Sequence, residues 1–188
     1  FRYTNSFKEA RFLRAYFYFN LVRAYGDVPY FTEMVTTDQV NSLTRTPAQE
    51  IFNAIIAECD KLSTELPADY TKLGLDGIAP AENGRVTCYA ALALKARAAL
   101  YAASPLFNPE NNKDLWRRAA EANKEVIETC TANGFKLSKY SELWGPNNWS
   151  NNEMIFVRRY NGNISTLEEY NFPMGVPGGN SGNCPTQN

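Results

Sequence analysis

The sequence predicts a mainly α-helical fold of tetratricopeptide-like hairpins, followed after residue 135 by an irregular, loop-rich segment with short strands. Four stretches with helical spacing of apolar side chains, each bounded by start and stop signals, support this prediction. Small residues also gather where neighbouring helices would cross. The chain has 188 residues, of which 44% are hydrophobic and 13% aromatic, enough for one domain with a buried core. We expect two parts, a helical part over residues 1–134 and a loop-rich part over residues 135–188.

The first helix is expected from Ser6 to about Tyr25. Ser6 and Glu9 have the spacing of a capping box, and Gly26 provides a stop signal. Seven aromatic side chains fall between residues 7 and 25, and helical spacing distributes them all round the cylinder. Such a helix must be enclosed by neighbours on several sides. It therefore belongs to a larger helical assembly, in which its aromatic side chains pack in a core.

The second helix is expected to begin near Thr46 and to run to Leu66. Thr46 is the predicted N-cap, Pro47 suits the first helical position, and Gln49 is placed to reach back to the cap. Pro67 ends the helix. Its apolar stripe has a period near 3.6 residues and consists of Ile51, Phe52, Ile55, Ile56, Cys59, Leu62 and Leu66.

Two more helices are expected over residues 86–103 and 114–132, after a loop over residues 67–84. The third helix contains eight alanines, which favour helix and allow neighbouring helices to approach closely. The fourth presents one apolar face and ends at Asn133 and Gly134. Four helices in two consecutive hairpins are typical of a tetratricopeptide-like solenoid.

The character of the sequence changes after residue 135. Residues 135–137 and 153–160 are interpreted as short extended segments, separated by a polar, turn-rich stretch. Residues 161–188 are rich in glycine, asparagine and proline and have no periodic apolar face. We expect this segment to fold over the helical part rather than to form a core of its own.

Charge and composition argue against several classes of function. The chain has 19 basic and 20 acidic residues, so it has no basic field for nucleic acid, and no apolar run approaches the roughly 18 residues of a membrane span. Histidine is absent, which excludes Ser-His and Cys-His pairs and histidine-bound zinc in these residues.

Neither a cofactor nor a metal is expected. The four cysteines lack a C-x-x-C spacing and are interpreted as free thiols, with a disulfide or metal site the less favoured alternative; they are Cys59, Cys88, Cys130 and Cys184. Residues 108–114 offer oxygen ligands for calcium, but they lack the spacing and glycine of an EF-hand loop. A solvated turn is therefore favoured there.

Several blocks of the sequence, in order, resemble the SusD/RagB family of outer-membrane nutrient-binding lipoproteins. The first helix with its continuation to Tyr30 resembles a family signature, and a "GRVT" element leads into an alanine-rich helix ending in "AASP". The remaining blocks are residues 116–144, 153–156 and 185–187. The resemblance implies an internal fragment of a longer protein, with the lipid-bearing cysteine before the first residue.

This resemblance implies a non-enzymatic binding protein on the surface of Bacteroidota-type bacteria. Family members are held by an N-terminal lipid and form a lid over a TonB-dependent SusC-like transporter. They capture oligosaccharides, or in some cases peptides, and pass them to that partner. On this view, membrane attachment is only through a lipid anchor outside this segment, and residues 135–188 are the start of a ligand-binding region.

Candidate ligand-binding residues lie in the second part of the chain. Sugar binding requires aromatic planes together with planar amide and guanidinium donors, and Trp149 lies among four asparagines. Arg158, Tyr160 and Tyr170 follow in the region from which family members draw part of their ligand site. The alternative for these residues is packing in a sheet edge or loop.

Two other functions compete with this interpretation. A tetratricopeptide-type protein-interaction scaffold would continue stacking helices at a near-constant period, whereas long loops interrupt this chain. A helical glycoside hydrolase requires two suitably placed carboxylates. The available acids lie at capping or solvent positions, and the adjacent Glu168 and Glu169 could not face one substrate from a regular strand.

Overall fold

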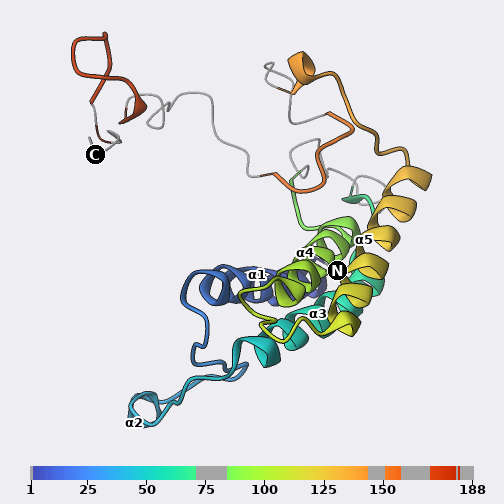
Figure 1. Cartoon of the computed structure of the whole chain (residues 1–188). Helices are drawn as coiled ribbons and strands as arrows, with labels where there is room; N and C mark the ends of the chain where they lie inside the picture. Colours follow the sequence, from blue (N-terminus) through green and yellow to red (C-terminus); the bar gives the residue numbers. More distant parts are fainter. Residues whose placement is uncertain (1, 71–83, 144–150, 158–169, 181, 183–188) are drawn as a thin grey trace. The chain divides into compact units, whose positions relative to one another are not determined.

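The computed structural model describes residues 2–70, 84–143, 151–157, 170–180 and 182 (Figure 1). The described part is mainly α-helical and contains no β-strand. Contacts divide the chain into two compact units, Phe1–Val157 and Arg158–Asn188. The first unit contains the helices α1 (Arg2–Tyr25), α2 (Thr37–Val40), α3 (Ala48–Glu65), α4 (Cys88–Ala103) and α5 (Lys113–Ala132), followed by the 3₁₀ helix η3 (Tyr140–Glu142).

The four long helices pack together, with α1 against α3, α3 against α4, and α4 against α5. Helix α1 also contacts α4, so α1, α3 and α4 enclose a common core (Figure 1). The four predicted helices are therefore confirmed, whereas the single turn of α2 was not predicted. None of the described helices is long and apolar enough to cross a membrane.

The core is built from large side chains of α1 and α3 and from the alanines of α4. The ring of Phe19 meets the rings of Phe52 and Tyr101 edge to face, with centroids 6.4 Å and 5.1 Å away. Such contacts add a directional term to the burial of apolar area. The largest fully buried side chains are Phe12, Phe19, Val22, Ile51, Phe52, Ile55, Cys59 and Leu62.

Only part of the aromatic content of α1 is buried. Phe12 and Phe19 are each 1% exposed, whereas Phe7 and Phe17 are 67% and 59% exposed. Within the described residues, the prediction that this helix is enclosed on several sides is therefore confirmed only in part. The side of α1 away from α3 and α4 faces outward.

The predicted start of α1 is also wrong, because the helix begins at Arg2 and Ser6 lies one turn inside it. No glycine or proline stands before Ser6 to prevent helical backbone from continuing. The predicted end is confirmed. Gly26 adopts a φ of +70°, and its N–H donates to the carbonyl of Val22 at 2.9 Å.

The start of α3 is capped differently from the prediction. Pro47 occupies the N-cap position and provides no side-chain hydrogen bond. Instead, the N–H of Ala48 donates to Oδ1 of Asp27 at 2.8 Å. Gln49 does not reach back to the cap, since its Nε2 donates to the carbonyls of Ala102 and Phe107, at 2.7 Å each. Both contacts join segments distant in sequence, so the local capping pattern could not predict them.

Arginines of α1 pair with carboxylates of α3. Nε of Arg11 lies 2.7 Å from Oε1 of Glu58, and Arg14 approaches the same oxygen at 3.8 Å. The hydrogen bond from Arg11 lowers the pKa of the Glu58 carboxyl. In α4, Nζ of Lys95 pairs with Asp60 and Glu125, at 2.5 Å and 2.7 Å.

The strands expected after residue 135 are absent from the described residues of both segments. One backbone hydrogen bond joins them, from Lys136 N to Asn152 O at 3.3 Å. Neighbouring backbone N–H groups are occupied by side chains, because Ser138 N donates to the Glu153 carboxylate and Glu153 N donates to Oδ1 of Asn151. A ladder cannot propagate when side chains take its backbone groups.

Candidate functional site

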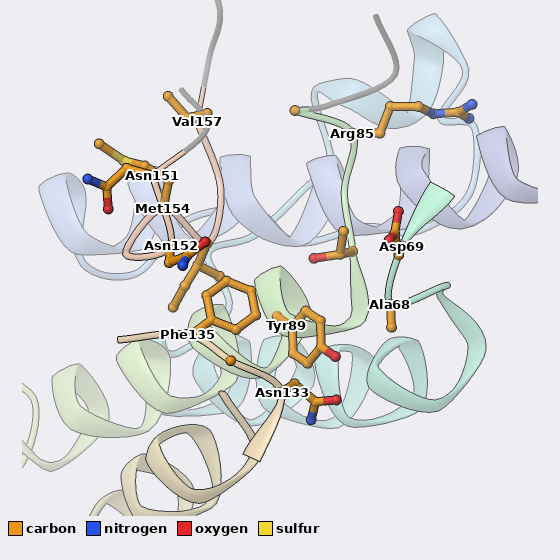
Figure 2. Close-up of a pocket in the computed structure, with 14 residues that line it drawn as sticks. Ala68, Asp69, Arg85, Tyr89, Asn133, Phe135, Asn151, Asn152, Met154 and Val157 are labelled. Atoms are coloured by element: carbon orange, nitrogen blue, oxygen red, sulfur yellow. The ribbon is translucent and has the colours of Figure 1, made fainter. Parts of the chain in front are cut away.

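A cavity of about 470 Å³ lies in the first unit, where the start of α4 and the end of α5 meet residues 151–157 (Figure 2). Its lining combines amide side chains, aromatic rings, an arginine and an aspartate, Asp69. Concave sites with a few convergent polar groups are the usual form of small-molecule binding sites. The described residues that line this cavity therefore form the candidate functional site.

Two aromatic rings form one wall of the cavity. Tyr89 lies in the first turn of α4, and its ring meets that of Phe135 at a centroid distance of 4.9 Å and an angle of 64° (Figure 2). Phe135 follows Gly134, whose φ of +87° reverses the chain after α5. The N–H of Phe135 donates to the carbonyl of Cys130 at 3.0 Å, which fixes this residue against the helix end.

Three asparagines add planar amides to the lining. Asn133 is held by its Nδ2, which donates to the carbonyl of Thr129 at 2.8 Å. Oδ1 of Asn151 accepts from Ser138 Oγ at 2.6 Å. Within the described residues, Nδ2 of Asn151 and the side-chain amide of Asn152 have no protein hydrogen bond. These groups remain available for a ligand that offers hydroxyl or carbonyl groups.

Arg85 lies on the other side of the cavity, in the loop before α4 (Figure 2). Its Nε and Nη2 donate to the two carboxylate oxygens of Glu9, at 2.8 Å and 2.7 Å. The guanidinium also lies over the ring of Tyr70, 4.4 Å from its centroid. Arg85 is thus held in position by α1 and by a neighbouring aromatic ring, and Glu9 balances its charge.

Of the four residues predicted to bind ligand, only Tyr170 lies within the described residues. Trp149, Arg158 and Tyr160 lie outside the described residues. Tyr170 belongs to the unit Arg158–Asn188, is 50% exposed, and packs its ring against Gly182. A Cβ at Gly182 would lie 2.2 Å from Cδ1 of Tyr170, so this contact depends on the glycine.

The cavity contains some of the residues that the sequence indicates for sugar binding. Asn151 and Asn152, two of the four asparagines around Trp149, line it, whereas Tyr89, Asn133 and Phe135 were not predicted as site residues. One sequence signal could have indicated Phe135 as a lining residue: it directly follows the helix stop at residues 133–134. A chain reversal brings the next side chain back toward the helix it follows.

The thiols are placed as predicted for the three described cysteines. Cys59, Cys88 and Cys130 are free, and Cys184 lies outside the described residues. Burial raises the pKa of the Cys59 thiol to about 12, so it stays protonated at neutral pH. Among the described residues, no group of three or more cysteine, aspartate or glutamate side chains is placed to hold a metal ion.

A family model described as starch-binding and associating with the outer membrane matches residues 2–100. Two curated proteins of Formosa agariphila are similar. SusD-like protein P25 is 25% identical over 149 residues, covering 79% of this chain and 24% of the relative. SusD-like protein P2 is 27% identical over 162 residues, covering 84% and 28%. The chain thus spans about a quarter of the length of these relatives.

Solved structures show the same likeness. A SusD-like protein from Bacteroides fragilis gives a TM-score of 0.63 at 28% identity, covering 84% of this chain and 27% of that structure. A SusD-like carbohydrate-binding protein from the same species gives 0.62 at 28% identity, covering 81% and 26%. Surface glycan-binding protein A from Bacteroides uniformis shares the fold, with a TM-score of 0.58 at 24% identity and coverage of 79% and 29%.

Proposed function

The chain belongs to the SusD-like family of outer-membrane-associated, non-enzymatic glycan-binding proteins, and from this we propose that the whole protein captures an oligosaccharide at the cell surface. The match over residues 2–100, more than half of the chain, is the observation that carries the proposal. We further propose that an N-terminal lipid holds the protein and that a TonB-dependent SusC-like transporter receives the ligand. A peptide is the alternative ligand.

The chemistry of the cavity supports a sugar as ligand. Hydroxyl groups on a sugar ring can both donate and accept, which suits the amides of Asn151 and Asn152. The rings of Tyr89 and Phe135 offer apolar surface for the C–H face of a sugar. The charge of Arg85 is balanced by Glu9, so the described lining does not require an acidic ligand.

Other features complete the proposed architecture. We propose a tetratricopeptide-like arrangement for the helices of residues 1–134 and a ligand-binding region that starts at residue 135. Trp149, Arg158, Tyr160 and Tyr170 are proposed to contribute aromatic and guanidinium groups to that region. The interruption of the helices by loops favours this binding protein over a continuous protein-interaction scaffold.

The experiment that tests this function is calorimetric titration of the full-length protein with starch-derived and other oligosaccharides. Asn152→Ala removes a cavity amide, and Trp149→Ala removes the proposed stacking ring. Lys124→Ala on α5, whose side chain is 72% exposed, is the matched control. We expect each of the first two variants to weaken binding by about tenfold, the loss of roughly one hydrogen bond or stacking contact.

If the protein binds peptides but no oligosaccharide, its ligand is a peptide, the alternative stated above. If the protein melts normally but binds neither oligosaccharides nor peptides, the proposed function is overturned. Unchanged affinity in Asn152→Ala alone would remove the cavity from the site while leaving the downstream residues in it.

A further inference from the structure

Helices α4 and α5 each carry a cysteine at the same end of their antiparallel pair. Cys88 is the first residue of α4, and Cys130 lies in the last turn of α5. Both thiols are free in the structure. Cys88 is partly exposed, whereas Cys130 is 6% exposed. Neither lines the candidate site, although each stands close in sequence to a residue that does.

The register of the two helices brings these cysteines to the same level. Nζ of Lys95 pairs with a carboxylate of α5 at 2.7 Å, and Nδ2 of Asn123 reaches a backbone carbonyl of α4 at 3.4 Å. Cys88 precedes Lys95 by seven residues, and Cys130 follows Asn123 by seven. Seven residues make about two turns, or about 10.5 Å along the axis. Each cysteine therefore lies on the same side of its helix as a residue that reaches across to the other helix.

Contacts beyond the helix ends agree with this register. The ring of Tyr89, the residue after Cys88, meets the ring of Phe135 at a centroid distance of 4.9 Å (Figure 2). The N–H of Phe135 in turn donates to the carbonyl of Cys130 at 3.0 Å. Burial raises the pKa of the Cys130 thiol, and the charge of the Cys88 thiolate raises it further, as expected for neighbouring thiols.

We propose that Cys88 and Cys130 are a dithiol pair that closes to an intramolecular disulfide between α4 and α5 when the protein meets a disulfide donor. A disulfide requires Cα atoms about 4.4–6.8 Å apart. Small side chains allow this approach, since α4 contains eight alanines and α5 buries Ala119 and Ala122. The cell-surface location proposed above would provide the oxidising conditions in which disulfides persist, but the pairing itself does not depend on that location or on the ligand.

The bond forms by two exchange steps. The partly exposed Cys88 thiolate attacks one sulfur of the donor, which gives a mixed disulfide and releases one donor thiol. The Cys130 thiolate then attacks the Cys88 sulfur, which forms the protein disulfide and releases the second donor thiol. The protein loses two electrons and two protons, and the donor disulfide is reduced to two thiols. The bond would fasten the aromatic wall that Tyr89 and Phe135 form in the candidate site.

The test is incubation of the native full-length protein with oxidised glutathione, followed by alkylation of the remaining thiols and peptide mapping without reductant. We expect a cross-linked pair of peptides that contains Cys88 and Cys130, with the mass of two hydrogen atoms missing, and its separation on reduction. Cys59 on α3 is the internal control. It is fully buried and its thiol has a pKa of about 12, so it should stay a thiol until the protein is unfolded.

Two variants test the order of the steps. Cys130→Ser should stop at the mixed disulfide, so Cys88 should retain one glutathionyl group. Cys88→Ser should leave Cys130 as a thiol, because Cys130 is only 6% exposed. The oxidised parent protein should also unfold at a urea concentration about 1 M higher than the reduced protein.

The map of the unsubstituted protein decides the proposal without any variant. The proposal is overturned if both thiols stay free in the native protein, or if either of them is linked to a different cysteine. It is equally overturned if Cys88 keeps its glutathionyl group while Cys130 is present, because the two sulfur atoms would then be too far apart to exchange.

Discussion

Replacing Glu9 by glutamine should weaken the link between α1 and the loop that carries Arg85. The two groups form a bidentate pair at 2.8 Å and 2.7 Å, and their side chains are 16% and 21% exposed. Exposed ion pairs contribute about 0–1 kcal/mol, whereas removing one partner of a buried pair costs about 3–5 kcal/mol. Because about four fifths of each side chain is buried, we expect an intermediate value: Glu9→Gln should lower the free energy of unfolding by about 2 kcal/mol.

The assay is urea unfolding of the full-length protein, followed by a signal from the helical part. With a slope of about 2 kcal/mol per molar urea, the expected loss lowers the midpoint by about 1 M. Lys124→Gln is the control, since its pair with Glu128 is 3.7 Å long and 72% and 66% exposed. We expect that variant to change stability by no more than about 0.5 kcal/mol.

A double-mutant cycle separates the pair from other effects of each substitution. Combining Glu9→Gln with Arg85→Gln should give a coupling energy of about 1–2 kcal/mol between the two positions. A coupling energy near zero would refute the reasoning, because the two side chains would then contribute independently. The reasoning would also be refuted if Glu9→Gln lowered the free energy of unfolding no more than Lys124→Gln does.

Three further substitutions test the core, the turn and the ion pairs. Leu62→Ala, at a position with no exposed area, should cost about 2–5 kcal/mol in urea unfolding, whereas Leu137→Ala, 87% exposed, should change stability by no more than about 0.5 kcal/mol. Gly134→Ala should cost about 1 kcal/mol by the same measurement, because φ is +87° while no heavy atom lies within 4 Å of the added Cβ. The pKa of Glu58 is lowered by the hydrogen bond from Arg11, so this stabilisation is present above the unfolded pKa and lost as pH falls through the folded pKa. Arg11→Met should therefore be less stable at neutral pH and should approach the parent on acidification; a constant difference at every pH would contradict this.

The long helices could be predicted because their signals are local. The stripe of α3 repeats within one segment, and Gly26, Pro67 and Gly134 mark helix ends without reference to the rest of the chain. Helix α2 was missed because four residues are too few to show a period. The cap of α3 was misassigned because its acceptor, Asp27, is 21 residues away in sequence.

The candidate site was harder to predict than the helices. Its lining comes from residues 68–69 after α3, the loop before α4, the first turn of α4, the turn after α5 and residues 151–157. Tertiary packing brings these segments together. Composition could identify Asn151 and Asn152 as suitable amides, but it could not place the ring of Tyr89 against Phe135. A sequence can indicate which side chains suit a sugar, whereas convergence of distant segments depends on the fold.

Helix α1 shows where a local sequence pattern stops predicting burial. Its aromatic content predicted neighbours on several sides, yet α3 and α4 cover only the face of Phe12, Phe19 and Val22. Burial of apolar surface stabilises a fold by about 25 cal/mol for each Å² removed from water, so the exposed ring of Phe17 and its apolar neighbours contribute none of this free energy. The aromatic-rich pattern of α1 therefore predicts more burial than α3 and α4 provide within the described residues, because helical spacing shows which side chains share a face but not how many faces neighbouring helices will cover.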